Sequence, residues 1–307
     1  MFAGRDILGT HDLSMTELDV ILETAERYAC ALENRERLRV MDGKILATLF
    51  FEPSTRTRLS FETAMLRLGG SVITVSEAGS SSAAKGESLA DSIKTVDGYA
   101  DVIAVRHPMK GAAQVAADAA SIPVINAGDG TGQHPTQALL DVYTIKKEQG
   151  RLEGLTVAMV GDLRNGRTVH SLVHLMAMFG NRLMFVAPPG LEMPAEVTAG
   201  LRSRGVDVYE THDLEEVIPH CDVLYVTRIQ RERFADQAEY ERYRGSYVVD
   251  GGLLRRAKPG LTIMHPLPRV DEIATDVDMH PGAAYFRQAH NGVPVRMALL
   301  ALVTGSV

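Results

Sequence analysis

Residues 45–51 form an apolar run, Ile-Leu-Ala-Thr-Leu-Phe-Phe, without the regular polar alternation of a half-exposed strand. Such a run is typical of a strand buried on both faces, as in a parallel sheet. Glu52-Pro53 ends the strand, and a helical pattern follows at once, with apolar positions Leu59, Met65, Leu66 and Leu68. Parallel strands need a crossover between them, usually a helix, so this stretch favours a parallel α/β fold.

The same alternation continues along the chain. Further strands are predicted at 71–75, 100–105, 123–126, 155–160, 182–187, 222–226 and 261–264. Helices are predicted at 14–33, 88–99, 111–120, 134–149, 168–179 and 294–303, the first of them with a capping box from Ser14 and Glu17. The predicted fold class is therefore α/β, with two doubly wound parallel-sheet domains. Right-handed crossovers join the strands within each sheet, and the active site is predicted in the cleft between the domains.

The chain is long enough for two domains, because 307 residues exceed what one hydrophobic core usually serves. Gly150-Arg-Leu-Glu-Gly154 marks the predicted boundary, and the strand–helix pattern restarts after it. We predict a first domain at 1–149 and a second at 150–285. The C-terminal helix, at about 286–307, is predicted to pack back on the first domain.

Composition excludes several functional classes. The net charge of −7 argues against a nucleic-acid partner or an anionic membrane surface. No apolar stretch reaches the length of a membrane span and no signal peptide is evident, so a cytoplasmic enzyme is predicted.

Cys30 and Cys221 form no metal or disulfide framework, and both are expected in the core. We predict no metal and no cofactor.

The turn after the first strand, Ser54-Thr-Arg-Thr-Arg58, combines three hydroxyls and two arginines at a helix start. The first N–H groups of a helix lack internal partners and the helix dipole there favours negative charge, so this turn suits an anion. A guanidinium fork at Arg56 fits phosphate oxygens. An ordinary capping turn with surface arginines is the alternative.

Other candidate residues follow the predicted strands of the first half. Arg106 lies at a strand's carboxyl end, where ligands bind in open parallel sheets. A Gly-rich loop at 127–133 leads to His134 and Gln137 at a helix start, where a neutral imidazole can donate a hydrogen bond to a carbonyl oxygen. The small, polar stretch 76–88 is predicted to be a mobile loop, with Lys85 at its far end as a cation that closes over a bound anion.

The second half offers a weaker set of signals. Arg228 ends a predicted strand, and the two prolines of 265–272 hold an extended turn. Residues 161–168 differ from a nucleotide-binding P-loop by Arg167 in place of lysine, which disfavours a nucleotide site. His170 and His174 are spaced to share a metal, but no third ligand is evident, so packing roles are favoured.

Seven stretches, in order, resemble the aspartate transcarbamoylase catalytic chains of the transcarbamoylase family, and the match covers essentially the whole chain. They are Phe-Glu-Pro-Ser-Thr-Arg-Thr-Arg, Lys-Gly-Glu, Val-Arg-His-Pro, Asn-Ala-Gly-Asp-Gly-Thr-Gly-Gln-His-Pro-Thr-Gln, Met-Val-Gly-Asp-Leu-Arg-Asn-Gly-Arg-Thr-Val-His-Ser, Thr-Arg-Ile-Gln-Arg-Glu-Arg and His-Pro-Leu-Pro-Arg-Val-Asp-Glu-Ile. The resemblance implies transfer of the carbamoyl group from carbamoyl phosphate to L-aspartate, an early step of pyrimidine biosynthesis.

The resemblance also implies roles for individual residues. The carbamoyl phosphate site would comprise Ser54, Thr55, Arg56, Thr57, Ser81, Lys85, Arg106, His134 and Gln137. The aspartate site would comprise Lys85, Arg167, Arg228, Gln230 and the backbone of Leu267 and Pro268. The catalytic residues would be Arg56, Thr57, Lys85, Arg106 and His134. Ser81 and Lys85 would come from the neighbouring subunit of a homotrimer.

Two alternatives stay open from the sequence. Ornithine transcarbamoylases share the phosphate turn, but they typically carry cysteine where this chain has Pro266, and they bind a cationic substrate. A non-catalytic nucleotide- or phosphate-binding α/β protein is the other. Ala84 departs from the lysine that many family members carry there. The sequence also leaves open whether regulatory chains or a dihydroorotase associate.

Overall fold

The computed structural model describes residues 1–76, 86–234 and 236–307. The chain divides into two compact units. Unit 1 comprises Met1–Leu140 together with Asn291–Val307, and unit 2 comprises Asp141–His290. Both divisions fall inside helices, because α5 spans Pro135–Gln149 and α11 spans Tyr285–Val303.

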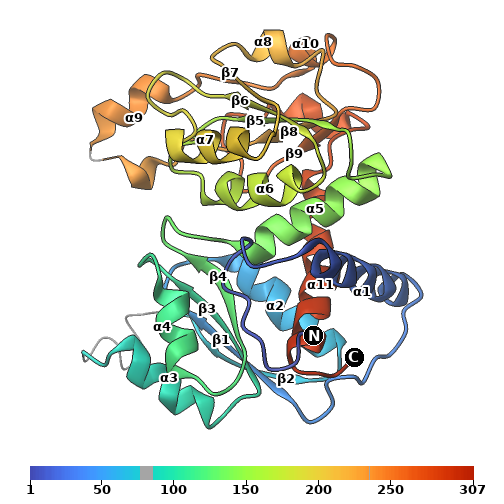
Figure 1. Ribbon diagram of the computed structural model, residues 1–307, viewed down its shortest axis with the longest axis vertical. Helices are drawn as coiled ribbons and strands as arrows, with labels where there is room; N and C mark the ends of the chain where they lie inside the picture. The colour runs from blue at the N-terminus through green and yellow to red at the C-terminus, as the bar shows by residue number, and fades with distance from the viewer. Residues whose placement is uncertain (77–85, 235) are drawn as a thin grey trace. The chain divides into compact units, whose positions relative to one another are not determined.

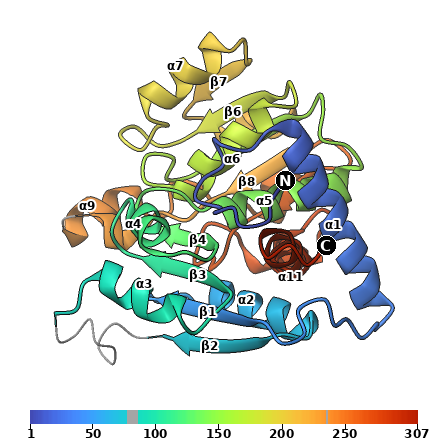
Figure 2. The same cartoon turned by 60° about the horizontal axis from the view of Figure 1, so that its bottom comes forward.

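Unit 1 is built on a four-stranded parallel sheet with strand order β2-β1-β3-β4. Its strands are β1 (Ile45–Phe50), β2 (Ser71–Val75), β3 (Val102–His107) and β4 (Val124–Asp129). The helices that precede or connect them are α1 (Met15–Glu33), α2 (Thr55–Arg67), α3 (Leu89–Asp97) and α4 (Ala112–Ala119). Figure 2 shows α3 and α4 on one face of this sheet and α2 with α11 on the other.

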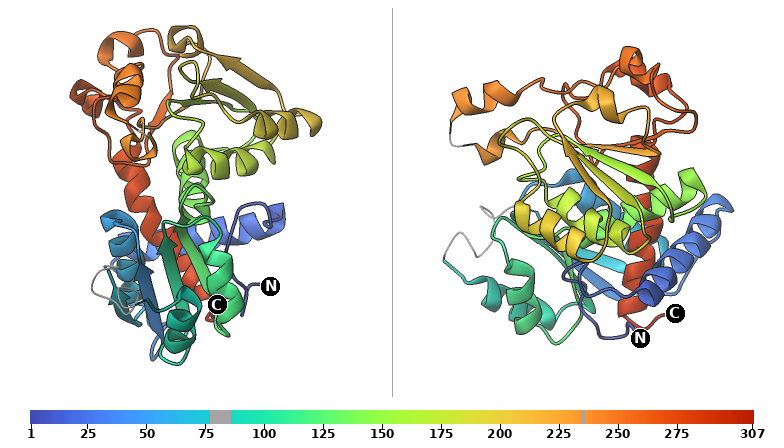
Figure 3. Two further views of the ribbon diagram at one scale, coloured as in Figure 1. Left: turned by 90° about the vertical axis from the view of Figure 1, so that its left-hand side faces the viewer. Right: turned by 45° about the horizontal axis from the view of Figure 1, so that its top comes forward.

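The core of unit 1 follows from the sequence pattern. Every residue of β4 is buried, as are nearly all residues of β1 and the first four of β3. The edge strand β2 is largely exposed, which accords with its place at the end of the sheet. Residues 291–307 belong to this unit: the Gly4 amide donates to Val303 O at 2.8 Å and Lys44 Nζ to Thr304 O at 2.9 Å. Figure 3 shows the two chain termini near each other.

Unit 2 is built on a five-stranded parallel sheet with strand order β7-β6-β5-β8-β9. Its strands are β5 (Thr156–Val160), β6 (Arg182–Val186), β7 (Val208–Thr211), β8 (Val223–Val226) and β9 (Thr262–Met264). Its helices are α6 (Arg167–Ala177), α7 (Ala195–Ser203), α8 (Leu214–Val217), η3 (Arg231–Arg233), α9 (Gln237–Tyr243), α10 (Gly251–Leu254) and η4 (Thr275–Met279). Figure 1 shows α6 and α7 on one face and α8 and α10 on the other.

The prediction of two parallel α/β sheets is confirmed, and several details of it differ in the structure. Strand β4 continues to Asp129, through residues predicted as loop. Helix α11 begins at Tyr285, close to the start at about 286 predicted for the C-terminal helix, and it contains Pro294 in its interior, so the helical range 294–303 started too late. The short edge strand β7 and the helices α7, α8, α9 and α10 went unpredicted. Cys221 is buried as expected, whereas Cys30 is exposed, because it lies on the outer face of α1.

Gly161, at the end of β5, allows β5 and β8 to approach closely. Its φ is +119°, and a Cβ placed there would lie 2.2 Å from Thr227 O. Gly161→Ala is therefore expected to destabilise the fold by about 1–3 kcal/mol, through overpacking and left-handed strain. Urea unfolding would measure the loss.

Gly200, inside α7, provides the matched control. No neighbouring atom lies within 4 Å of a Cβ placed there. Gly200→Ala is expected to stabilise the protein by about 0.5–1 kcal/mol, because alanine is the better helix former. Equal effects of the two substitutions would contradict the steric argument at Gly161.

Candidate active site

The predicted phosphate residues of unit 1 follow the carboxyl ends of three neighbouring strands. In the order β2-β1-β3-β4, the connection from β1 runs to one side and that from β3 to the other. The sheet therefore has its topological switch point between β1 and β3, where open α/β sheets bind ligands. Residues 54–57 follow β1, and Arg106 is the penultimate residue of β3. The two strands are joined there by a hydrogen bond from the Phe51 amide to Arg106 O at 2.8 Å.

The turn after β1 presents the start of α2. Ser54 occupies the N-cap position, and its side chain makes no capping hydrogen bond. The Arg58 amide makes the first bond along the helix, to Ser54 O at 3.2 Å, so the amides of residues 55–57 precede the helical ladder. Thr55 and Arg56 are exposed, whereas Thr57 is buried. This is the geometry of an anion-binding helix terminus.

Arg106 is held beside the switch point by contacts with a carboxylate and with a backbone carbonyl. Its Nε lies 3.3 Å from Glu52 Oε2, and its Nη1 donates to Ala127 O at 3.3 Å. The side chain is only 11% exposed. These contacts fix the orientation of the guanidinium, and the Glu52 carboxylate offsets its positive charge.

His134 and Gln137 lie at the start of α5, and both are buried. Asp129 at the end of β4 shapes the loop that leads to them. Its carboxylate accepts the amides of Gly111 at 2.8 Å and Gln133 at 2.6 Å. The Gln137 amide then donates to His134 O at 3.0 Å, which sets the first turn of the helix.

Ser81 and Lys85 lie outside the residues that the structure describes, so their predicted roles stay predictions. The rest of the predicted phosphate set, from Ser54 to Gln137, lies at the end of β3 and in the segments that follow β1 and β4, at the starts of α2 and α5.

The predicted aspartate residues of unit 2 also flank a switch point. In the order β7-β6-β5-β8-β9, it lies between β5 and β8. Arg167 begins α6 after β5, and Arg228 and Gln230 follow β8. Gln230 Nε2 donates to Asn165 O at 3.4 Å, which joins the two loops. Arg167 is buried, whereas Arg228 and Gln230 are half-buried.

A pocket opens at this edge of the unit 2 sheet. It is lined by Val160, Gly161, Val226, Thr227, Arg228, Ile229, Tyr240, Arg244, Gly245, Ser246, Tyr247, Val270, Asp271 and Glu272. Arg228 therefore faces a concave surface that also carries the end of the 265–272 turn. Arg244 pairs with Asp271 across it, with Nε 3.0 Å from Oδ2.

Three buried polar residues at this edge were not assigned from the sequence. Asp162 accepts the Asn165 amide at 3.0 Å, and burial raises the pKa of its carboxyl. His265 and Glu272 pair at 2.7 Å. All three stood inside the motifs quoted above. A polar residue just after an apolar strand was the available signal for Asp162 and His265, and Glu272 had no such signal.

The His265–Glu272 pair has a defined charge state. Burial lowers the pKa of His265, and the bond to Glu272 opposes this only in part. Burial alone would raise the pKa of Glu272, but the hydrogen bond from His265 and bonds from the backbone lower it. The pair is therefore a neutral imidazole with a carboxylate. For the metal site considered at His170 and His174, the described ranges contain no cluster of three metal-ligating side chains.

Folding stability is expected to decrease as the pH falls below about 6.5. Burial lowers the pKa of both His265 and His107 in the folded protein, so the unfolded chain binds more protons in that window. The stability that the two neutral histidines contribute is fully present above their pKa in the unfolded chain. It is lost as the pH falls toward their lower pKa in the folded protein. Urea unfolding between pH 7.5 and 5.5 measures the slope, and His265→Gln should make it shallower. An unchanged slope in this variant would remove His265 from the effect.

Comparisons with known proteins match both units. The family model "Aspartate/ornithine carbamoyltransferase, carbamoyl-P binding domain" matches residues 5–148. The model "Aspartate/ornithine carbamoyltransferase, Asp/Orn binding domain" matches residues 153–303. Among the described residues, no helix is both long and apolar enough to cross a membrane.

Individual relatives agree with the family models. The aspartate carbamoyltransferase catalytic subunit of Thermococcus kodakarensis is 59% identical over 302 residues, covering 98% of this chain and 97% of the relative. The Trypanosoma cruzi aspartate transcarbamoylase, solved with carbamoyl phosphate and aspartate, is 42% identical with a TM-score of 0.94, covering 98% and 97% of the two chains. The M. jannaschii catalytic subunit is 50% identical with a TM-score of 0.90, covering 96% of each chain. The resemblance is confirmed, and this chain belongs to the aspartate/ornithine carbamoyltransferase family.

Proposed function

We propose that this protein transfers the carbamoyl group of carbamoyl phosphate to the amine of L-aspartate, giving N-carbamoyl-L-aspartate and phosphate. One observation carries the proposal: each sheet has a pair of arginines at its switch point, Arg56 and Arg106 in unit 1 and Arg167 and Arg228 in unit 2. Two separate cationic pairs suit two anionic substrates. The names of the relatives assign those substrates as carbamoyl phosphate and aspartate.

Unit 1 binds carbamoyl phosphate in this proposal. The amides at the start of α2, with Ser54, Thr55, Arg56 and Arg106, hold the phosphate. Thr57, Arg106 and His134 donate to the carbamoyl oxygen, and Gln137 holds the carbamoyl amide. The buried position of His134 at a helix N-terminus favours a neutral imidazole, which donates a hydrogen bond without adding charge.

Unit 2 binds aspartate. Arg167 and Arg228 pair with its two carboxylates, and Gln230 assists them. The backbone of Leu267 and Pro268 orients the amine and the carbamoyl group. An ornithine side chain would place a cation against these arginines, so like-charge repulsion disfavours it.

The reaction then needs no covalent intermediate. The aspartate amine attacks the carbamoyl carbon, the new C–N bond forms, and negative charge develops on the carbonyl oxygen, where fixed donors stabilise it. The bond from the carbon to the phosphate oxygen breaks, and the leaving phosphate takes up the amine proton. Holding both substrates in register supplies much of the acceleration, a contribution that reaches about 7–11 kcal/mol in well-oriented reactions.

The deciding experiment supplies purified protein with carbamoyl phosphate and either L-aspartate or L-ornithine. We expect carbamoyl aspartate and phosphate to appear in equal amounts with aspartate, and no citrulline with ornithine. Product formation with ornithine alone would reject the proposal in favour of the ornithine branch. Phosphate release that is independent of either amine would reject transfer altogether.

We propose a cytoplasmic homotrimer in pyrimidine biosynthesis, in which Ser81 and Lys85 of one subunit complete the site of its neighbour. The family resemblance supports this arrangement, and both residues lie outside the described ranges.

Sharing of sites predicts complementation. Lys85→Ala and His134→Ala homotrimers should each be nearly inactive, because each lacks one group at every site. Mixed trimers should recover activity, since a site made from the Lys85→Ala subunit's His134 and the other subunit's Lys85 is intact. Trimers separated by charge tags would be assayed individually. Confirmed mixed trimers without recovered activity would argue against shared sites.

A further inference from the structure

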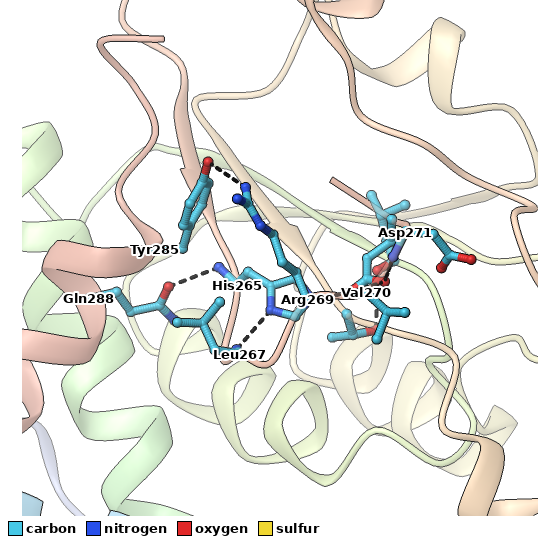
Figure 4. Close-up of polar contacts among 10 residues, drawn as sticks. His265, Leu267, Arg269, Val270, Asp271, Tyr285 and Gln288 are labelled. Carbon is cyan, nitrogen blue, oxygen red and sulfur yellow. Dashed lines mark hydrogen bonds and ion pairs between the residues drawn. The ribbon is translucent and has the colours of Figure 1, made fainter. Parts of the chain in front are cut away.

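The turn at 265–272 is pinned at both ends by one buried side-chain pair. His265 directly follows β9 and is 1% exposed. Its Nδ1 lies 2.8 Å from the Leu267 amide and its Nε2 2.7 Å from Glu272 Oε1. Glu272 Oε2 also accepts the amides of Val270 and Asp271, each at 3.2 Å. Figure 4 shows the imidazole bonded to Leu267 within this turn.

These contacts fix the tautomer of His265. A backbone amide can only donate, so Nδ1 must be the acceptor of the Leu267 N–H. The ring proton then resides on Nε2 and is donated to Glu272. Protonation of Nδ1 would place two donors against each other and release Leu267. Because both nitrogens are occupied in a buried site, His265 has no position from which to exchange a proton with substrate.

The pair is itself anchored to the body of unit 2. The His265 amide donates to Gln288 Oε1 at 2.9 Å, and Gln288 Nε2 donates to Asp141 Oδ1 at 2.7 Å. Tyr225, in β8, donates its hydroxyl to Asp141 Oδ2 at 2.8 Å. The turn therefore rests on α5, α11 and β8 through an unbroken chain of buried hydrogen bonds, and such networks specify one conformation strongly.

Leu267 needs this support. Its φ is +57°, in the left-handed region that a branched side chain rarely occupies. A residue in such a conformation persists only when its surroundings impose it. Leu267 is half-buried, and the bond from its amide to His265 holds the residue whose backbone would face the substrates.

We propose that His265 and Glu272 are positioning residues, which hold the Leu267–Pro268 backbone in register with the aspartate amine and the carbamoyl group. This inference rests on the proposed function and deepens it: the pair acts on the acceptor side of the reaction, through the turn, and without proton transfer. The inference therefore predicts that disrupting the pair lowers kcat/KM for aspartate and leaves the affinity for carbamoyl phosphate unchanged.

Two substitutions at His265 separate its two bonds. The Asn side-chain oxygen can take the place of Nδ1, so His265→Asn keeps the acceptor for the Leu267 amide and loses the bond to Glu272. His265→Gln reaches Glu272 but loses the acceptor. We expect His265→Gln to lower kcat/KM for aspartate by about 100-fold, as small misplacements in active sites do, and His265→Asn to recover most of it.

A second histidine supplies the control. His280 makes the same local contact, with Nδ1 accepting the Gly282 amide at 3.1 Å, after η4 and apart from the turn. His280→Gln should leave kcat and KM for aspartate within about twofold of the wild type. Glu272→Gln, which sets an amide donor against backbone donors, should reproduce the direction of the His265→Gln effect.

The test compares the effect of each substitution on aspartate kinetics with its effect on the binding of carbamoyl phosphate. Steady-state kinetics give kcat and KM for aspartate, and equilibrium dialysis without aspartate gives the affinity for carbamoyl phosphate, which should stay within about twofold in every variant. The inference would be overturned by a parallel loss of carbamoyl phosphate affinity or by equal effects of Asn and Gln at His265. Unchanged aspartate kinetics in both His265→Gln and Glu272→Gln would also overturn it. A wild-type protein that does not carbamoylate aspartate would instead reject the proposed function, and the inference with it.

Discussion

Arg56→Ala is expected to lower kcat/KM for carbamoyl phosphate by about 10²–10³-fold, the loss typical of removing one donor from a charge-stabilising site. Arg56 is the second residue of α2, exposed beside the helix amides that precede the ladder. Its fork adds full charge and planar geometry where the helix terminus offers only partial charge. Steady-state kinetics with saturating aspartate would measure the effect.

Arg58→Ala is the matched control, because Arg58 lies two residues further along the same helix. Its Nε is 3.8 Å from Glu62, the spacing of an ordinary pair along a helix. Both side chains are half-buried, and i, i+4 pairs along a helix contribute only about 0.3–0.5 kcal/mol, so this variant should keep nearly full activity. If Arg56→Ala saturated normally with carbamoyl phosphate, or if both variants lost activity equally, Arg56 would not be a phosphate ligand.

Arg228→Ala is expected to raise KM for aspartate by about 10–100-fold, because a hydrogen bond to a charged group contributes roughly 1.5–3 kcal/mol. Arg228 follows β8 and lines the pocket at the switch point of the unit 2 sheet. Its loss should leave the affinity for carbamoyl phosphate unchanged. Arg228→Lys should recover only part of the effect, since an ammonium lacks the bidentate fork.

Arg231 provides the comparison for Arg228. It lies three residues further on, exposed, with its Nε donating to Gln237 Oε1 at 2.6 Å. Arg231→Ala should change KM for aspartate by less than about twofold. A similar rise in both variants would point to general electrostatic attraction of the dianion, and would remove the specific role from Arg228.

Features set by local chemistry were predictable from the sequence. The capping box of Ser14 and Glu17 is present at α1, because both partners lie within four residues of each other. The strand from Ile45 and the helix after Ser54 likewise depend on short-range patterns. Since parallel strands share a direction, the alternation also placed the candidate arginines at one edge of each sheet.

Features set by tertiary contacts were not predictable. Strand β7 has only four residues and little apolar character, so its existence depends on pairing with β6. The apolar pattern from Pro294 gave a helix over 294–303, yet α11 runs through Pro294 from Tyr285, as the wider range of about 286–307 had it. His265 and Glu272 stand seven positions apart, and only the fold of the turn brings them together. Amino-acid type alone gave no sign that they pair.

The discontinuous composition of unit 1 has a consequence for how the protein comes into being. The ribosome delivers residues 141–290, the whole of unit 2, before it delivers residues 291–307. Buried positions such as Val295, Leu299 and Val303 of the unit 1 core arrive only then, roughly ten to thirty seconds after Leu140. Unit 2 can therefore complete its fold first, while a nascent unit 1 waits with apolar surface exposed, and slower translation lengthens that exposure.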